Sequence, residues 1–228
     1  MGVNGTISLR DRHDVSFEFY CIVDAGFVRK RPDLVARVIQ EDLLLFTTPL
    51  VLCYIAQCFP LDQMRCRIFL IEDVLYPACK RSLRHRDLLA VQANSDAVLF
   101  DEAAPLGFSM NLKRGVIDGR TVAYTALQAL VWLGFDQVFL HGLDLLDATH
   151  TPRFYETADS MQASSLDAQF DAFIEPSFRG ASTLLRSLGV KVKNLSPNSA
   201  LDAAIFEKID WRTLTRGHTA MAELRFAA

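Results

Sequence analysis

Polar residues able to bind a ligand stand directly beside short apolar runs of this chain. Near the N-terminus, Asn4 lies between two glycines, with Gly5 following it directly. Glycine permits close backbone approach to a ligand, and the Asn4 amide can both donate and accept hydrogen bonds. Asp24 follows the apolar run 17–23, at a place where α/β proteins hold ligand-binding carboxylates. The residues predict a phosphate or base cradle at Asn4 and Gly5 and a ligand contact at Asp24. An ordinary turn and a helix cap are the alternatives.

A second set of candidates opens the helical segment 121–133. Gly119, Arg120 and Thr121 stand at its start. The unpaired N–H groups at the start of a helix bind phosphate, and an arginine there adds a bidentate donor. Threonine is also a common helix cap, so a plain N-cap at Thr121 is the alternative interpretation.

The apolar run 137–140 ends in His141, Gly142 and, after one leucine, Asp144. In a parallel sheet these residues would lie at the face where ligands bind. A histidine in such a place is most often hydrogen-bonded structure. His141 and His150 have no metal-ligand spacing with cysteines or carboxylates, so no zinc site is predicted.

The last candidates lie in a polar turn after the apolar run 190–195. Pro197, Asn198 and Ser199 form this turn. Serine and asparagine side chains there could contact a nucleotide. Ser199 is also expected to cap a following helix that holds the apolar residues of 201–206.

Short apolar runs alternate with helical segments along the whole chain, and this pattern defines the fold class. The runs are 17–23, 43–47, 67–71, 97–100, 137–140 and 190–195. Continuous apolarity is typical of strands buried on both faces of a parallel sheet. The helices are expected to begin at Pro32, Thr121 and Gly180, and the last two end at Gly134 and Gly189. The pattern predicts a single α/β domain over 1–228, doubly wound around a mostly parallel sheet, with helices on both faces (Rossmann-like).

Composition excludes several classes of protein. The chain has 228 residues and a formal net charge of −3, which gives no electrostatic footprint for nucleic acid. Its five cysteines form no CxxC pair, and they are interpreted as reduced thiols that serve as small hydrophobic residues in the cytoplasm. The apolar runs are too short to span a bilayer. The chain opens directly in the Asn4 turn, so the first strand of the domain is expected to be missing.

Taken in order, these segments resemble the motifs of a bacterial sugar-transferase superfamily. It includes sialyltransferases and related lipopolysaccharide-core proteins, some of them regarded as Kdo transferases. The resemblance runs from Gly2 to about Leu201, and its central signature comprises Gly119–Gln128, Leu133–Phe135 and Leu140–Asp144. The first turn resembles the family's Gly-Asn-Gly turn, and 195–199 resembles its Cys-Pro-Asn-Ser turn.

The resemblance implies which residues bind the nucleotide. In the sialyltransferases, the first turn and the start of the central helix hold the CMP of the donor sugar, which carries over to Asn4 and Thr121. Val122 stands where the family has a serine, and Asp24 where it has an asparagine. The late turn carries over as Pro197, Asn198 and Ser199.

The family's catalytic residues do not carry over. Its histidine general base has no counterpart, since 157–189 contain no histidine, and Leu146 replaces its tyrosine. A base is required because the acceptor hydroxyl loses a proton as it attacks the sugar. The nearest substitutes are His150, Asp144, Tyr155 and Glu156. Either one of these replaces the base, or this protein does not catalyse transfer.

The function implied by the resemblance is sugar transfer in lipopolysaccharide or surface-glycan biosynthesis, with a CMP-activated acidic sugar as donor. No metal or other cofactor would be required. The acceptor would be a glycan or glycolipid, and the location the cytoplasm or the inner face of the inner membrane, with peripheral association at most. Self-association stays open. The alternatives are a non-catalytic nucleotide-binding or scaffold protein, and a pyrophosphokinase-like phosphotransferase with magnesium held by Asp24 and Asp144.

Overall fold

The computed structural model of this chain describes residues 1–78, 97–101 and 104–214. It is a Rossmann-like α/β fold in which a four-stranded and a three-stranded sheet are both entirely parallel. The predicted fold class is therefore confirmed.

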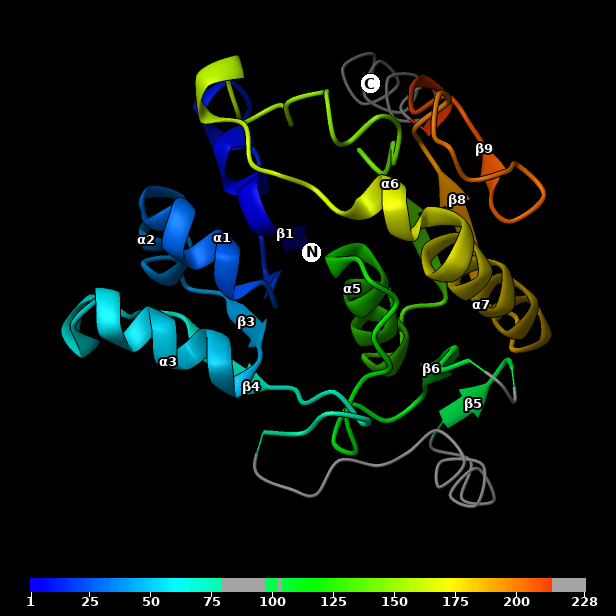
Figure 1. Cartoon of the computed structure of the whole chain (residues 1–228), viewed down its shortest axis with the longest axis horizontal. Helices are drawn as coiled ribbons and strands as arrows, with labels where there is room; N and C mark the ends of the chain where they lie inside the picture. The colour runs from blue at the N-terminus through cyan, green and yellow to red at the C-terminus, as the bar shows by residue number, and fades with distance from the viewer. Residues whose placement is uncertain (79–96, 102–103, 215–228) are drawn as a thin grey trace, which may run out of the picture.

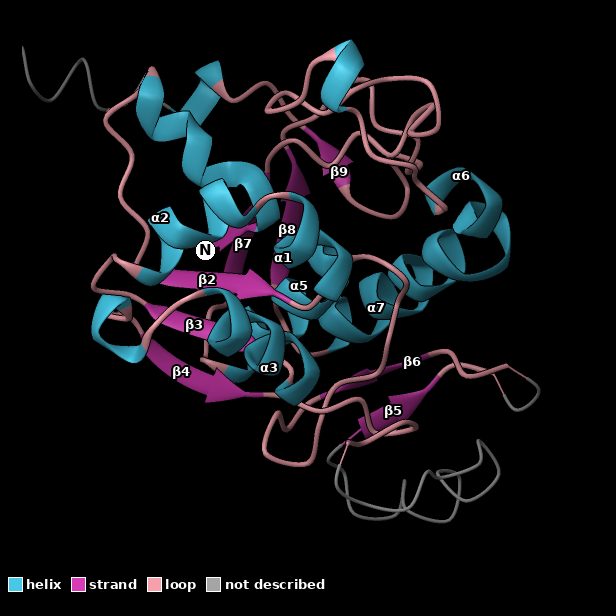
Figure 2. Ribbon diagram, turned by 60° about the vertical axis from the view of Figure 1, so that its left-hand side comes forward, coloured by secondary structure: helices cyan, strands magenta, loops and turns pink. Residues whose placement is uncertain are grey.

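The first sheet has the strand order β1-β2-β3-β4, and Figure 2 shows β2, β3 and β4 side by side. Its strands are β1 (Gly2–Val3), β2 (Phe19–Ile22), β3 (Leu44–Thr47) and β4 (Arg67–Leu70). The first strand is present, but it has only two residues, which pair with Tyr20 and Cys21 of β2. The turn expected to lack a strand in front of it therefore follows a very short one.

Helices cover both faces of this sheet (Figure 1). α1 (Ala25–Lys30), α2 (Pro32–Ile39) and α3 (Pro49–Cys58) pack on one face, in a core that includes Tyr20, Ile22 and Leu45. α5 (Val122–Trp132) packs on the other face, where Ala126 and Ala129 join Cys21 and Phe46. Successive residues of one strand thus enter opposite cores, which is why these strands are continuously apolar. Two short 3-10 helices, η1 (Asn4–Asp11) and η2 (Leu61–Gln63), lie in the connections.

The second sheet has the order β7-β8-β9, with strands Gln137–Leu140, Lys191–Asn194 and Glu207–Lys208. The α5 residues Tyr124 and Leu127 pack into its core with Phe178 and Leu185 of α7 (Glu175–Ser187). α5 therefore contributes to the cores of both sheets. Before α7 come η4 (Ala158–Ser160), α6 (Leu166–Gln169) and the π-helical turn η5 (Phe170–Ile174).

The ends of the predicted helices follow local signals, with two corrections. Gly134 and Gly189 have φ angles of +92° and +76°, as expected for glycines that terminate α5 and α7. α7 begins at Glu175 rather than at Gly180, because Pro176 suits the first helical turn. The helix predicted after Ser199 is wrong, since 201–206 form turns that lead into β9.

The run 97–100 was expected in the parallel sheet, but it forms a separate antiparallel pair. β5 (Ala97–Leu99) pairs with β6 (Gly107–Ser109). The chain between them is too short for the crossover that parallel strands require, whereas an antiparallel pair needs only a hairpin.

The cysteines differ in exposure. Cys21 is fully buried, and burial raises the pKa of its thiol to about 12. Cys53 and Cys58 are exposed on α3, so their assignment as buried small hydrophobic residues is wrong. Cys79 lies outside the described residues. In the described parts of the chain, every helix is too short or too polar to cross a membrane.

Candidate functional site

The turn that follows β1 is hydrogen-bonded to the buried side chain of Tyr20. The Tyr20 hydroxyl donates to the carbonyl of Asn4 at 2.7 Å and accepts from the backbone N–H of Ile7 at 2.8 Å. Asn4 has a φ of +42°, in the left-handed region that asparagine tolerates better than most residues. Its side-chain oxygen, Oδ1, is buried and has no hydrogen-bond partner among the described residues. The turn therefore contains a buried hydrogen-bond acceptor that no described residue satisfies.

Gly5 is in contact with a residue far along the chain. A Cβ atom at Gly5 would overlap the ring of Tyr155, so only glycine permits this contact. The backbone carbonyl of Tyr155 accepts from Nη1 of Arg31 at 2.9 Å. Burial raises the pKa of the Tyr155 hydroxyl to about 12, which makes it a poor base near neutral pH. Two residues predicted for different roles, Gly5 and Tyr155, are thus packed together.

Asp24 has the role of a helix cap. Its Oδ1 accepts from the backbone N–H of Gly26 at 2.7 Å, at the start of α1. The side chain remains exposed at the end of β2, and its charge contributes to the raised pKa of Tyr155. The cap predicted as the alternative is confirmed, and the ligand contact at Asp24 stays a prediction.

The residues at the start of α5 also make local structural contacts. A Cβ atom at Gly119 would overlap the buried ring of Tyr124, and Thr121 Oγ1 accepts from the N–H of Ala123 at 3.4 Å. The guanidinium of Arg120 pairs with Asp118 at 3.1 Å. The N-cap at Thr121 is confirmed. No acidic residue stands in the first turn of α5, so its positive dipole end is not neutralised from within the helix.

The turns after β7 and β8 are joined by hydrogen bonds. The N–H of Gly142 donates to Ser196 Oγ at 3.0 Å, and the N–H of Ala200 donates to the carbonyl of Asp144 at 2.7 Å. Ser199 Oγ donates to the carbonyl of Leu143 at 2.5 Å. Ser199 therefore connects the two turns instead of capping a helix.

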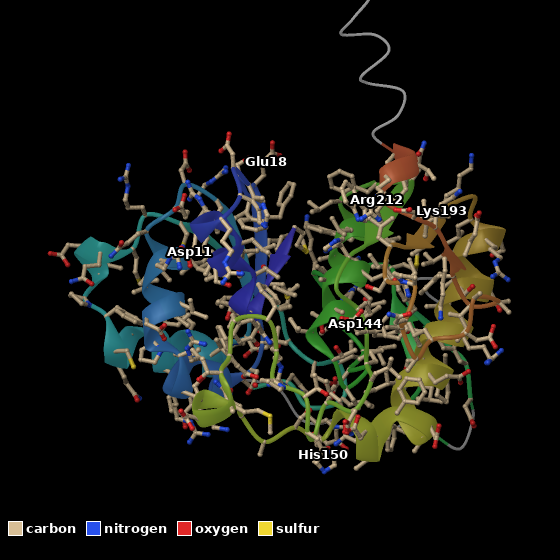
Figure 3. The ribbon with its side chains drawn as sticks, turned by 90° about the horizontal axis from the view of Figure 1, so that it is seen from above. Asp11, Glu18, Asp144, His150, Lys193 and Arg212 are labelled. Atoms are coloured by element: carbon tan, nitrogen blue, oxygen red, sulfur yellow. The ribbon has the colours of Figure 1, made fainter. Side chains whose placement is uncertain are left out.

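Three candidate residues of these turns make no side-chain hydrogen bond to another described residue. Asp144, Pro197 and Asn198 are exposed at the ends of β7 and β8. Figure 3 shows His150 at the edge of the molecule opposite Glu18, which precedes β2, with Asp144 between them. Asp144 follows the carboxyl end of β7, as expected from the sequence.

The remaining catalytic candidates differ in how they are held. His150 is exposed, and its Nδ1 lies 2.6 Å from Asp147 Oδ1, which raises the pKa of the imidazole. The Glu156 side chain is fully buried, and it accepts from the backbone N–H of Arg153 at 2.9 Å and from its guanidinium at 3.1 Å. Glu156 is therefore occupied by a structural ion pair, whereas Asp144 and His150 are open to a ligand.

The contacts bring the candidates together in two groups. Asn4, Gly5 and Tyr155 form one group, and the turns that hold Asp144 and Ser199 form the other. The start of α5 approaches the first group, because Val122 and Val3 pack into the same core. The resemblance implies that Thr121 and Asn198 contact one nucleotide. No hydrogen bond within the described ranges joins the two residues, so this shared contact stays a prediction.

The residues missed from the sequence are Tyr20, Arg31 and Arg153. A tyrosine inside a buried strand must find a partner for its hydroxyl, and this signal could have identified Tyr20. Arg31 donates to the carbonyl of Tyr155, which is distant in the sequence, and Arg153 pairs with Glu156 within an irregular segment, so no sequence pattern marks either contact.

A groove of about 530 Å³ lies away from all these candidates. It runs between α7 and β8, and its lining includes Arg186, Lys191 and Glu207. Arg186 Nη2 donates there to the carbonyl of Ile205 at 2.9 Å, and Lys193 pairs with Glu207 at 3.1 Å. The groove contains none of the predicted site residues.

In comparisons with known proteins, no family model matches the chain, and neither a curated protein nor a solved structure matches it. The resemblance to bacterial sialyltransferases therefore stays a prediction from the motifs. Within residues 1–78, 97–101 and 104–214, no group of three or more His, Cys, Asp and Glu side chains is placed to hold a metal ion.

Proposed function

We propose that this protein binds a CMP-activated acidic sugar at the carboxyl ends of its strands and transfers the sugar to a glycan or glycolipid in lipopolysaccharide or surface-glycan assembly. The observation that carries the proposal is the buried, unpartnered Oδ1 of Asn4, in a left-handed turn directly after β1. A buried acceptor without a partner costs free energy, which a ligand can recover by donating to it. The exocyclic amino group of cytosine is such a donor, and uracil has an acceptor at the same position.

The proposed transfer needs a leaving-group stabiliser and a base. The start of α5 would stabilise the phosphate of departing CMP through its N–H groups and dipole. Asp144 is the better base of the two open candidates. His150 is held toward its charged form by Asp147 and so accepts a proton only at higher pH. Tyr155 and Glu156 are assigned structural roles, on the contacts described above.

The second candidate function is nucleotide binding without catalysis. It is favoured because two of the four expected bases have structural roles. Tyr155 packs against Gly5, and Glu156 forms an ion pair with Arg153. Measuring binding and turnover separately distinguishes the two functions.

The binding test is a thermal-shift series with CMP, CDP, UDP, GDP and ATP. CMP or CDP is expected to stabilise the protein most, by about 2.7 kcal/mol at a hundredfold excess over the dissociation constant. Asn4→Ala should abolish the preference for CMP over UDP, whereas Gln57→Ala, at an exposed position of α3, should not change it. A shift with ATP as large as that with CMP would contradict the assignment.

The turnover test follows CMP release from CMP-linked sialic acid and CMP-linked Kdo in the presence of a glycan acceptor. Release by the wild type, lowered about a hundredfold or more in Asp144→Asn, supports transfer with Asp144 as base. CMP binding with no release from either donor supports the non-catalytic function.

A further inference from the structure

The segment between Asp144 and α6, residues 145–165, crosses from one part of the molecule to another, and we call it the strap. It leaves the end of β7, reaches the start of η1, where the Tyr155 ring lies against Gly5, and returns to α6. Its near end is fixed by Asp167 of α6, which accepts from the N–H of Ala148 at 3.0 Å and of Thr149 at 2.7 Å. Its far end has a different attachment.

The far end is attached through Tyr155. Its ring lies against Gly5 and meets the ring of Phe27 edge-on, with centroids 6.3 Å apart. The guanidinium of Arg31 lies 5.7 Å from the ring centroid and donates to the Tyr155 carbonyl. Arg31 is itself fixed by two hydrogen bonds to Asp33, at 3.0 and 2.8 Å. Gly5 of η1, Phe27 of α1 and Arg31 therefore form the surface against which the Tyr155 side chain of the strap packs.

This attachment occupies the surface that a ligand of the first turn would need. Because Gly5 has no side chain, another group can approach its Cα closely, and the Tyr155 ring occupies that space. A nucleotide approaching the backbone of Gly5 closely would overlap the ring.

The attached arrangement also leaves polar groups unsatisfied. Asn4 Oδ1 in the turn and Gln162 Nε2 in the strap are both buried without hydrogen-bond partners among the described residues. A buried polar group without a partner costs free energy, so both groups lower the stability of the attached arrangement.

We propose that Tyr155 is a latch that holds the strap closed over the Asn4–Gly5 turn, and that a ligand of this turn enters only when the latch releases. The part of this proposal that concerns nucleotide entry rests on the proposed function, whereas the latch itself rests on the packing alone. Release requires no chemistry, only movement of the Tyr155 ring off Gly5 and loss of its contacts to Arg31.

The latch is tested by hydrogen–deuterium exchange on the full chain. Tyr155→Ala and Arg31→Ala are expected to speed exchange in 145–165 and in 1–11 by about tenfold, because local opening sets exchange rates. Tyr155→Phe keeps the ring and should exchange as the wild type does. The β2 and β3 segments report the fold in every variant. Unchanged exchange of the strap in both alanine variants would overturn the latch.

The exclusion of ligand is tested by CMP titration of the same variants in a calorimeter. Removing a competing closed form should raise the CMP affinity of Tyr155→Ala by about threefold or more. A lower affinity in this variant would overturn the exclusion, since the ring would then be a wall of the site. Faster strap exchange with no CMP binding to any variant would support the latch and refute the proposed function, so the two failures are distinguishable.

Discussion

The two parallel sheets of this protein are built from strands of similar length but are covered differently. In the first sheet, β2 and β3 send residues into cores on both faces, as Cys21 and Ile22 illustrate. In the second, β7 and β8 bury one face only. Val138 is buried in the core shared with α7, whereas Phe139 is 43% exposed and stands in register with Lys193. The first sheet is the centre of the fold, and the second has an uncovered outer face among the described residues.

The difference shows how the two sheets obtain their stability. The first gains it from apolar burial on both faces. The second replaces part of that burial with polar connections at its carboxyl end, where Ser196 and Ser199 bind the turn after β7. The same end carries Asp144 and Asn198, so the polar turns that stabilise the second sheet also form part of the candidate site.

The largest expected difference in stability between the two sheets is tested by replacing one phenylalanine in each sheet with alanine. Phe46→Ala in β3 removes a fully buried ring and should lower the free energy of unfolding by about 3–5 kcal/mol. Phe139→Ala in β7 should lower it by less than about 1 kcal/mol, because surface positions tolerate truncation. Urea unfolding at neutral pH measures both. Equal losses would mean that the outer face of β7 is covered in solution.

A second test concerns α5, which packs into both cores. The buried side chain of Gln128 accepts from the N–H groups of Ser109 and Ile117, at 2.8 and 3.1 Å, and donates to the carbonyl of Ile117 at 3.0 Å. Gln128→Ala leaves these backbone groups unsatisfied and should cost about 2–3 kcal/mol. Gln137→Ala, an exposed glutamine of β7, is the matched control and should cost almost nothing. A loss as small as that of the control would mean that the backbone groups of Ser109 and Ile117 find other partners in the variant.

A smaller effect is expected from the polar connection of the second sheet. Ser199→Ala removes the hydrogen bonds of Oγ to the carbonyl of Leu143 and the N–H of Leu201, and should cost about 1–2 kcal/mol. The melting temperature should fall by a few degrees, roughly 2–4 °C per kcal/mol for a chain of this size. Asn198→Ala, at the exposed neighbouring position, should leave the melting temperature unchanged. A similar fall in both variants would argue that the turn, rather than the hydroxyl, is what matters.

The smallest effect concerns the exposed end of the second sheet. Asp147 raises the pKa of His150 above its ordinary value of 6.5, first through their hydrogen bond and then through charge. The contact therefore favours the folded state below pH 6.5 and is lost as the pH rises through the raised pKa. Asp147→Asn should bring the pKa of His150 back toward 6.5, as followed by NMR of the imidazole protons. A pKa that stays raised would assign the shift to another carboxylate, such as Asp167.

The candidate site was predictable in part. The caps at Asp24 and Thr121 follow from residue type and position alone, and both are confirmed. The position of the site residues at the carboxyl ends of parallel strands followed from the alternation of strands and helices. The role of Glu156 as a buried partner of Arg153 was not predictable, because the fold of the strap depends on contacts outside it.

By itself, the sequence determined the properties that act over a few residues. It determined which runs become strands and where Gly134 and Gly189 end helices. The expectation that 190–195 is buried on both faces is wrong, because Lys191 of β8 is exposed. The tertiary structure alone decided what lies against Gly5 and Gly119, and that Ser199 binds Leu143 instead of capping a helix. Backbone preferences depend on a few neighbouring residues. The residue that packs against a glycine, or the partner of a hydroxyl, is set by contacts that form only in the folded chain.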